Sequence, residues 1–265
     1  MSQTYETIEL NATPDGVAVV TLNRPDKHNA FNHVVIDELS DVFETLRGDE
    51  YLRLIILRGA GKSFSAGADL DWMRAAADYT QKENEDDAYK LAQMLKKIYE
   101  LPQTTLALVQ GAAMGGGAGL VAACDVAIAM KGTSFRFSEV RLGLTPATIS
   151  PFVIETIGPS WSRALFVTGE SFDADFAHKI GLVHYVAETD EEMLQLEEHI
   201  AKLAFHTAPG AVNDAKALVR DIKDKPINDS LGHETARRIA ARRASEEGRE
   251  GLAAFLEKRK PSWVS

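Results

Sequence analysis

Short apolar runs alternate with stretches of helical spacing up to about residue 190. Continuous apolar runs predict buried strands, and they lie at residues 17–22, 54–57, 106–109, 126–129 and 182–186. A further strand is expected at 5–10, before a turn at 14–16. Apolar positions three and four residues apart predict helices at 35–46, 91–99, 149–157 and 160–167. Strands that alternate with helices predict an α/β fold with a mostly parallel sheet.

Two segments interrupt this alternation. The acid-rich segment 78–87 is expected to precede the helix at 91–99, and Gly158-Pro159 divides the two later helices. From residue 190 onward all segments have helical spacing, and the helices are predicted at 190–204, 210–222, 228–247 and 249–259. We therefore expect a core at residues 1–200 and a C-terminal helical region at 201–265.

A glycine-rich loop follows one of the predicted strands. Gly115, Gly116 and Gly117 come after the strand at 106–109 and lead into a small-residue segment that predicts a helix. Glycine leaves backbone N–H groups open to a ligand, and a helix N-terminus adds partial positive charge. The loop is therefore expected to receive negative charge, with phosphate as the first candidate. A second small-residue loop spans 59–70.

Composition excludes several classes of function. The chain of 265 residues has a formal net charge of −10, which argues against general nucleic-acid binding. Its one cysteine, Cys124, leaves no internal disulfide and no thiolate-rich zinc site, and its 7 histidines lack metal-ligand spacing. The apolar runs are too short for a membrane span, and residues 1–10 lack the features of a secretory signal. We therefore expect a cytoplasmic protein that binds neither membrane nor nucleic acid.

Three motifs occur together and in order along the chain. They are Phe64-Ser65-Ala66-Gly67-Ala68-Asp69-Leu70, Gly111-Ala112-Ala113-Met114-Gly115-Gly116-Gly117 and Phe137-Ser138-Glu139-Val140-Arg141-Leu142-Gly143-Leu144-Thr145-Pro146. They resemble the two oxyanion loops and the glutamate loop of the crotonase (enoyl-CoA hydratase/isomerase) family, and residues 22–25 and 257–260 also fit. The resemblance implies an α/β fold, the ClpP/crotonase-like spiral of ββα units, with a C-terminal helical region used for trimerisation. Such trimers often pair into hexamers.

The resemblance also implies an acyl-CoA thioester substrate and a reaction through an enolate. Family members hold the thioester carbonyl between two backbone N–H groups, which stabilise the negative charge that develops on its oxygen. By position, the donors are Ala68 and Gly116, and Glu139 transfers protons. Taken singly, either loop also fits a tight turn, and Glu139 also fits a solvated surface carboxylate.

One position departs from the pattern of typical hydratases. They carry a second glutamate two residues beyond the glycine triplet, where this chain has Gly119. A single glutamate is also the pattern of Δ3,Δ2-enoyl-CoA isomerases, so both reactions stay open. A non-catalytic acyl-CoA-binding protein is a third hypothesis, and the retention of Glu139 and both loops speaks against it.

Further residues resemble one bacterial branch of the family. Gly119, residues 146–151 and residues 71–74 are similar to hydratases of branched, carboxylated enoyl-CoAs, namely methylglutaconyl-CoA of leucine breakdown and carboxygeranoyl-CoA of terpene breakdown. We therefore expect hydration of an enoyl-CoA of this kind. Arg74 and Arg141 are the candidates to meet a distal carboxylate, and each fits a solvated arginine equally well.

The CoA part of the substrate needs contacts of its own, and the resemblance implies no other cofactor. Arg24 and Lys27 correspond to the family's phosphate-binding edge. Phe255 and Lys258 match residues that reach the CoA of a neighbouring subunit in a homotrimer or hexamer. Contacts along the pantetheine are expected from Ala66, Asp69 and Leu70.

Overall fold

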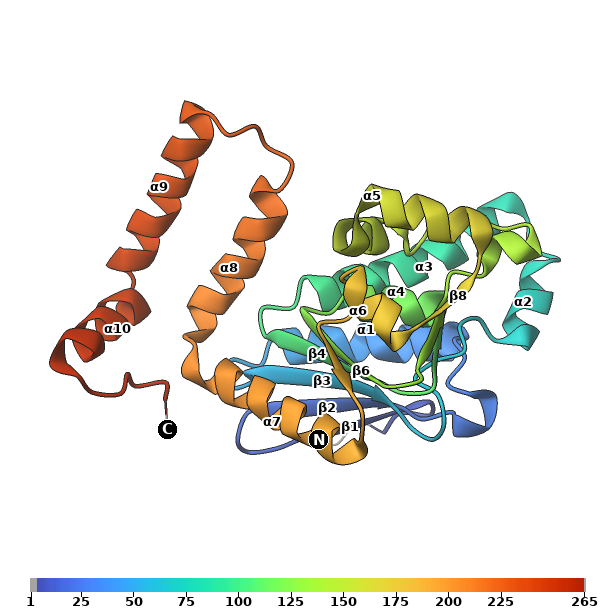
Figure 1. The fold of residues 1–265 in the computed structure, drawn as a ribbon, viewed down its shortest axis with the longest axis horizontal. Helices are drawn as coiled ribbons and strands as arrows, with labels where there is room; N and C mark the ends of the chain where they lie inside the picture. The colour runs from blue at the N-terminus through green and yellow to red at the C-terminus, as the bar shows by residue number, and fades with distance from the viewer. Residues whose placement is uncertain (1–3, 265) are drawn as a thin grey trace. The chain divides into compact units, whose positions relative to one another are not determined.

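The computed structural model describes residues 4–264, and its main sheet is six-stranded. The strands are β1 (Ile8–Ala12), β2 (Val17–Leu22), β3 (Leu54–Gly59), β4 (Thr104–Val109), β6 (Val126–Met130) and β9 (Tyr185–Ala187). Their order is β1-β2-β3-β4-β6-β9, and β1 alone among them pairs antiparallel, with β2 (Figure 1). The predicted α/β fold with a mostly parallel sheet is confirmed.

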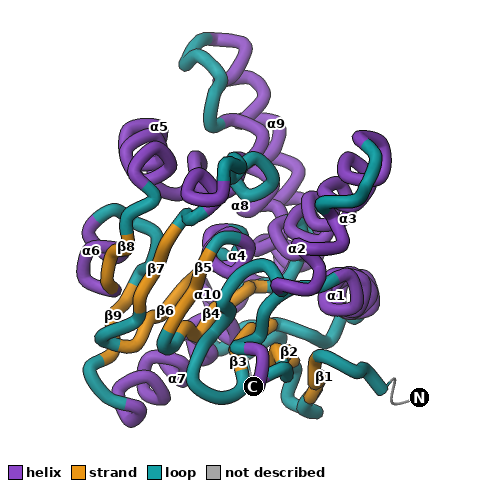
Figure 2. The backbone as a smooth tube through the Cα atoms, turned by 90° about the vertical axis from the view of Figure 1, so that its right-hand side faces the viewer, coloured by secondary structure: helices purple, strands orange, loops and turns teal. Residues whose placement is uncertain are grey.

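A second, three-stranded sheet carries the segment before the glycine triplet (Figure 2). Its strands are β5 (Ala112–Met114), β7 (Ser134–Arg136) and β8 (Ser171–Asp173). β5 pairs parallel with β7, and β7 pairs antiparallel with β8. Phe135 of β7 is fully buried and its ring stacks on that of Phe172, so aromatic side chains anchor this small sheet in the core.

Helices pack around these sheets within the first of the two compact units into which the chain divides, which ends at Glu198. They are α1 (His33–Arg47), α2 (Leu70–Ala76), α3 (Gln81–Tyr99), α4 (Gly116–Ala122), α5 (Ser150–Thr168) and α6 (Ala174–Lys179), with 3-10 turns η1 (Pro25–Lys27) and η2 (Glu139–Leu142). The side chain of Asn32 caps α1 by accepting the N–H of Val35, and the predicted apolar face of α1 is buried.

Three local predictions differ from the structure. The acid-rich segment 78–87 lies mostly in α3, because Thr80 and Glu83 form a capping box that starts the helix at Gln81. The short helix α2 was not predicted; Asp69 caps it by accepting the N–H of Asp71. The first and last strands are shifted, to 8–12 and 185–187. The expected interruption at Gly158 is present, with a left-handed φ of 74° inside α5.

The second unit begins at His199, close to the predicted border at 200/201. α7 (Asp190–His206) crosses the division and is followed by α8 (Pro209–Ile222), α9 (Asp229–Ala244) and α10 (Glu246–Glu257). Ion pairs of Arg238 with Asp221 and of Arg242 with Glu247, both within 3 Å, connect these helices. Within residues 4–264, no helix combines the length and apolarity that a membrane crossing needs.

The two motif loops leave the main sheet side by side. β3 and β4 are neighbouring parallel strands, and their carboxyl ends at Gly59 and Val109 lead into the loops. Ligands of parallel sheets bind outside the carboxyl ends of the strands, because the loops there converge. The fold therefore brings the two glycine-containing segments to one place.

Candidate active site

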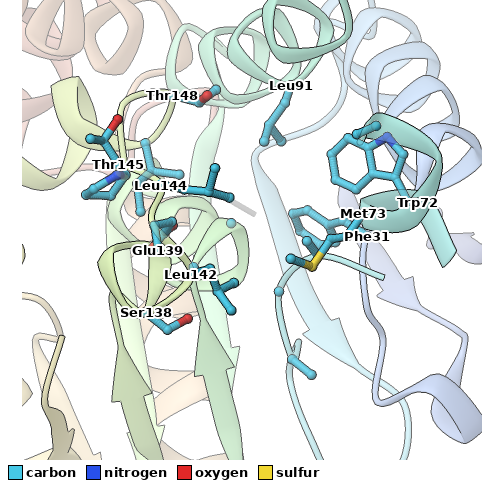
Figure 3. A pocket seen from close by; sticks show the side chains of 18 of the residues that line it. Phe31, Trp72, Met73, Leu91, Ser138, Glu139, Leu142, Leu144, Thr145 and Thr148 are labelled. Atoms are coloured by element: carbon cyan, nitrogen blue, oxygen red, sulfur yellow. The ribbon is translucent and has the colours of Figure 1, made fainter. Parts of the chain in front are cut away.

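A cavity of about 400 Å³ opens between the two motif loops, α2, α3 and the segment after η2. Figure 3 shows Glu139 and Leu144 on one side of it, with Phe31, Met73 and Trp72 on the other. Most of the lining is apolar, which suits a hydrocarbon group. Its larger apolar side chains are Phe31, Leu70, Trp72, Met73, Leu91, Leu142, Leu144, Pro146 and Ile149.

The loop at residues 65–69 is held by backbone hydrogen bonds on both sides. On one side it forms a parallel bridge with Phe31, in which the Phe31 N–H donates to Gly67 O (2.6 Å) and the Asp69 N–H donates to Phe31 O (2.8 Å). On the other side Ser65 forms a parallel bridge with Ala113. The hydrogen bonds of the bridge with Phe31 are made by Gly67 and Asp69, which lie on either side of Ala68. The N–H of Ala68 itself therefore points away from Phe31.

The glycine triplet starts α4 at the cavity wall. Gly115 has a left-handed φ of 48°, and its N–H donates to Arg136 O (2.9 Å), which fixes the turn into the helix. A Cβ on Gly116 would lie 3.1 Å from the ring of Phe31, and one on Gly117 would lie 2.8 Å from Ser65 Cβ. Glycine is needed here because the neighbouring loop packs directly against the backbone.

Two backbone donors are left without acceptors in this arrangement. Within residues 4–264, no hydrogen bond engages the N–H of Ala68 or that of Gly116, which belongs to the first turn of α4. Ala68 and Gly116 both line the cavity. A pair of unengaged N–H groups on one apolar cavity is an arrangement that can stabilise an oxyanion.

Glu139 lies next to this pair of donors. A Cβ on Gly115 would lie 3.2 Å from Glu139 Oε1, so the carboxylate is close to the turn that carries Gly116. Oε2 is buried and, in the part of the chain that the structure describes, has no hydrogen-bond partner. Burial raises the pKa of Glu139 by more than its own backbone N–H lowers it. A carboxylate that is costly to ionise and lines a cavity is suited to proton transfer.

Ile149 occupies the space beside Gly119. A Cβ on Gly119 would lie 2.4 Å from Ile149 Cγ2, so this position has no room for a side chain. Ile149 is buried and lines the cavity. Where a second glutamate was considered from the sequence, the structure therefore presents an aliphatic group. The other carboxylate among the lining residues is Asp87, whose Oδ1 accepts the indole N–H of Trp72 (3.2 Å).

A model of the family described as enoyl-CoA hydratase/isomerase matches residues 12–265. The chain belongs to this family. A crystal structure of an enoyl-CoA hydratase from Shewanella pealeana superposes with a TM-score of 0.93 at 39% identity, covering 97% of this chain and 96% of that one. A crotonyl-CoA hydratase of Syntrophomonas wolfei is 32% identical over 263 residues, covering 98% of this chain and 99% of the relative.

An isomerase is among the relatives as well. A mitochondrial Delta(3,5)-Delta(2,4)-dienoyl-CoA isomerase of Dictyostelium discoideum is 27% identical over 255 residues, covering 92% of this chain and 86% of the relative. The likeness to members of the enoyl-CoA hydratase/isomerase family confirms the predicted crotonase fold with its mixed α/β content. Hydratases and isomerases of the family share this framework, so the reaction has to be argued from the site.

A second cavity, of about 320 Å³, adjoins the first along the same loop. Ala66, Ala68 and Leu70 line both cavities. The second cavity is also lined by Lys27, whose side chain is 58% exposed and lies 3.9 Å from the carboxylate of Asp71. Such an exposed and weakly paired ammonium group is open to an anionic ligand.

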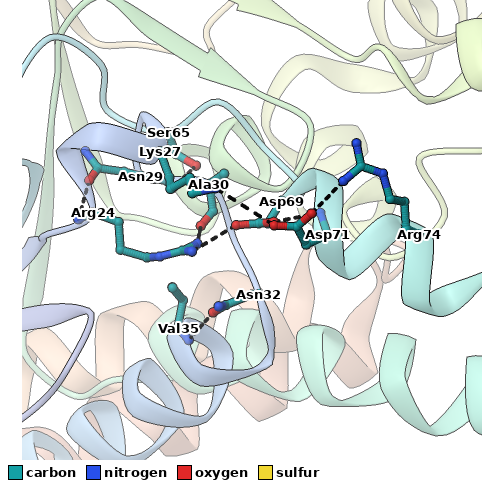
Figure 4. Close-up of polar contacts among 10 residues, drawn as sticks. All are labelled: Arg24, Lys27, Asn29, Ala30, Asn32, Val35, Ser65, Asp69, Asp71 and Arg74. Carbon is teal, nitrogen blue, oxygen red and sulfur yellow. Dashed lines mark hydrogen bonds and ion pairs between the residues drawn. The ribbon is translucent and has the colours of Figure 1, made fainter.

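Other predicted contacts are paired with protein groups. Asp69 also lines the second cavity, and its carboxylate forms a shielded ion pair with Arg24 (2.9 Å) (Figure 4). Arg74 pairs with Asp71 (2.6 Å) and is 76% exposed, while Arg141 donates its Nε–H to Gly169 O (2.9 Å). Neither Arg74 nor Arg141 is among the residues that line the cavity of about 400 Å³.

Phe255 and Lys258 belong to the second unit. Phe255, in α10, is 80% exposed, and Lys258 follows that helix with a left-handed φ of 55°. Among residues 4–264, no cluster of three or more His, Cys, Asp or Glu side chains is arranged to hold a metal.

Most of the apolar lining of this family member's cavity was not predicted from its sequence. Trp72 and Met73 come from α2, which was not recognised as a helix, and Leu91 comes from α3. The capping pattern at Asp69 and the apolar positions after it could have indicated α2. Phe31 carried no such signal, because its role follows from a bridge to a distant loop.

Proposed function

We propose that this protein is an enoyl-CoA hydratase, which adds water across the 2,3-double bond of an acyl-CoA thioester. The observation that carries the proposal is the placement of two unengaged N–H groups and one buried, unpartnered carboxylate on a single apolar cavity. The N–H groups of Ala68 and Gly116 bind the thioester oxygen. The acyl chain extends into the apolar cavity.

The two donors act when charge moves onto the oxygen. Attack at C3 of the enoyl group converts the thioester into an enolate, and the negative charge is received by N–H groups that are already in place. Loss of one such preorganised donor typically costs about 3 kcal/mol of transition-state stabilisation. Their fixed position follows from the hydrogen bonds of Phe31 and Gly115 with neighbouring segments.

Glu139 carries out the proton transfers. As carboxylate it takes a proton from water while the water oxygen bonds to C3, and as carboxylic acid it returns a proton to C2 of the enolate. A positioned acid–base group contributes about 10²- to 10⁴-fold in rate. The raised pKa of Glu139 supports this role, because it brings the acid and base forms closer in free energy near neutral pH.

The acyl group is proposed to be branched or carboxylated, as in 3-methylglutaconyl-CoA. The wide apolar lining supports a branched chain. No lysine or arginine is among the lining residues, and the carboxylate of Asp87 would repel a distal carboxylate of the substrate. We therefore expect branching to influence the rate more than a distal negative charge does.

The CoA moiety is proposed to follow the second cavity, past Ala66 and Leu70 towards Lys27. CoA is part of the substrate, and the reaction as written needs no further cofactor. Phe255 and Lys258 are proposed to reach the CoA of a neighbouring subunit in a homotrimer or a dimer of trimers, which the exposure of the Phe255 ring supports. We also propose a cytoplasmic location for this protein.

One observation favours a second function, Δ3,Δ2-enoyl-CoA isomerisation. Ile149 fills the space beside Gly119, so Glu139 has no second carboxylate there to help it hold a water. A single carboxylate is sufficient to take a proton from C2 and return it to C4 through a dienolate, whose oxygen would be bound by the same two N–H groups. Water is less easily held in a cavity with this much apolar lining.

An absorbance assay separates these functions. The protein is incubated with crotonyl-CoA, 3-methylglutaconyl-CoA and trans-3-hexenoyl-CoA. Hydration of either of the first two removes the enoyl-thioester absorbance, whereas isomerisation of the third creates it. Isomerisation without any hydration would replace the proposed function by the second one. If none of the three thioesters is turned over although they still bind, the protein is a non-catalytic acyl-CoA-binding protein.

A further inference from the structure

One arginine holds the loop that carries Ala68. The guanidinium of Arg24 donates from Nη1 to the carbonyl oxygen of Ala30 (2.6 Å) and from Nη2 to Oδ2 of Asp69 (2.9 Å) (Figure 4). Ala30 directly precedes Phe31, and Asp69 directly follows Ala68. A single side chain thus connects the two segments that form the bridge between Phe31 and Ala68.

This ion pair is shielded from solvent. The side chains of Arg24 and Asp69 are 17% and 6% exposed. The second oxygen of the carboxylate, Oδ1, accepts the N–H of Asp71 (2.8 Å) and caps α2. Burial alone would raise the pKa of Asp69, but the Asp71 N–H and the Arg24 guanidinium outweigh it and hold the pKa below its ordinary value. The carboxylate is therefore ionised at neutral pH.

The backbone of Arg24 is fixed as well. Its N–H donates to Oδ1 of Asn29 (2.8 Å), and the N–H of Asn29 donates back to the Arg24 carbonyl (2.9 Å). The amide group of Asn29 also donates to Ser63 O (2.8 Å), in the strand-to-loop segment before the oxyanion loop. The arginine therefore projects from a turn that is itself attached to the loop it holds.

We propose that Arg24 and Asp69 are positioning residues for the Ala68 N–H donor, although the sequence assigned both to CoA. Asp69 lines the second cavity, but its two carboxylate oxygens are engaged by Arg24 and by the N–H of Asp71. This inference rests on the proposed function, because the donor matters only when a thioester carbonyl is bound. A displacement of about 1 Å in such a group can cost about 10²-fold in rate. Lys27, with its side chain 58% exposed, stays the candidate for the CoA phosphates.

The test compares crotonyl-CoA with crotonyl-pantetheine, which keeps the thioester and lacks the phosphates and adenosine. Arg24→Lys and Asp69→Asn are each expected to lower kcat about 10- to 100-fold on both thioesters, with KM within about 3-fold. Lysine keeps the charge but cannot hold two acceptors in a fixed fork, and asparagine keeps the helix cap without the charge. The double variant should lose no more than the worse single variant.

Two control variants separate the alternatives, one by the opposite pattern and one by an unchanged kcat. Lys27→Met should raise KM for crotonyl-CoA and leave crotonyl-pantetheine unaffected. Asp71→Asn replaces a neighbouring carboxylate that is 70% exposed and should keep kcat within about 2-fold. Thermal unfolding of each variant shows whether it is folded at the assay temperature.

The outcomes separate this inference from the proposed function. A loss confined to crotonyl-CoA, with a raised KM, would assign Arg24 to the phosphates and overturn the inference. So would full activity of a folded Asp69→Asn variant on both thioesters. If instead the unmodified protein turns over neither thioester, the proposed hydratase function fails before any variant is compared.

Discussion

Two neighbouring parts of the main cavity's lining are built differently. The backbone donors of Ala68 and Gly116 are fixed by backbone hydrogen bonds and by the ion pair of Arg24 with Asp69. The Glu139 carboxylate next to them has an oxygen with no hydrogen-bond partner within residues 4–264. A group that donates must be held still, whereas a group that gains and loses a proton must not be committed to one charge state.

Replacing Glu139 tests the unpartnered carboxylate and should have the largest effect. Glu139→Gln keeps the shape and removes the proton-transfer group, so kcat should fall about 10²- to 10⁴-fold for hydration or isomerisation. Steady-state kinetics on the substrate that the unmodified protein prefers measure this loss. Substrate binding should persist, because the amide leaves both backbone donors untouched. Full activity in the Gln variant would exclude Glu139 as the acid–base group.

Crowding Gly116 tests the fixed backbone donors and should have the next largest effect. The Cβ of Gly116→Ala would lie 3.1 Å from the ring of Phe31, so the donor must shift, and we expect kcat to fall about 10- to 100-fold. Adding Phe31→Leu should recover part of that loss by making room. Gly232→Ala is the matched control, because a Cβ there meets no atom within 4 Å. An unchanged kcat in Gly116→Ala would show that the donor tolerates movement.

Filling the position beside Ile149 should affect stability more than rate. The Cβ of Gly119→Ala would lie 2.4 Å from Ile149 Cγ2, and overpacking of this kind costs about 1–3 kcal/mol in the free energy of unfolding. Denaturant unfolding measures the cost. Trimming the partner in Gly119→Ala/Ile149→Ala should return most of it. If the single variant is as stable as the unmodified protein, the glycine is not required by packing.

The pH dependence should show the smallest effect. Because burial raises the pKa of Glu139 in the folded state, ionisation there costs stability, and that cost grows as pH rises through the raised pKa. Glu139→Gln should therefore have a higher Tm than the unmodified protein at pH 8. The difference in Tm should vanish below about pH 4, near the ordinary pKa of glutamate, where the side chain at position 139 is neutral in both proteins. Equal Tm values across this range would show that burial does not perturb the group.

The same pKa shift predicts the acid limb of the rate profile. The base form of Glu139 is lost as pH falls through its raised pKa, so kcat/KM should decline at a higher pH than for an ordinary glutamate. A limb that coincides with an unperturbed glutamate would contradict the buried position of the carboxylate.

Local signals in the sequence were sufficient for the framework. The apolar runs at 54–57 and 106–109 identified two buried strands, which the structure shows to be parallel neighbours, and the glycine triplet identified the start of a helix. Glu139 and the two loops were found because their motifs are contiguous in the chain. The structure then placed all three on one cavity.

Long-range contacts could not be predicted in this way. Arg24 and Asp69 were each assigned to CoA, since nothing in either local sequence indicates a partner 45 residues away. The contact of Gly119 with Ile149 is equally invisible, because an absent side chain leaves no pattern of its own. Helix α2 was missed for a local reason, its short length after a loop of small residues.

The loop shared by the two cavities has a consequence for regiochemistry. Ala66, Ala68 and Leu70 line both, so in the proposed reaction the carbonyl marks the boundary between the CoA side and the acyl side. With the carbonyl carbon as C1, the carbons that react in the proposed hydration are always C2 and C3. Longer chains, and chains branched beyond C3, change only the part of the substrate that lies farther along the cavity. The fixed position of the thioester oxygen therefore decides which carbon receives the water, whatever the length of the chain beyond.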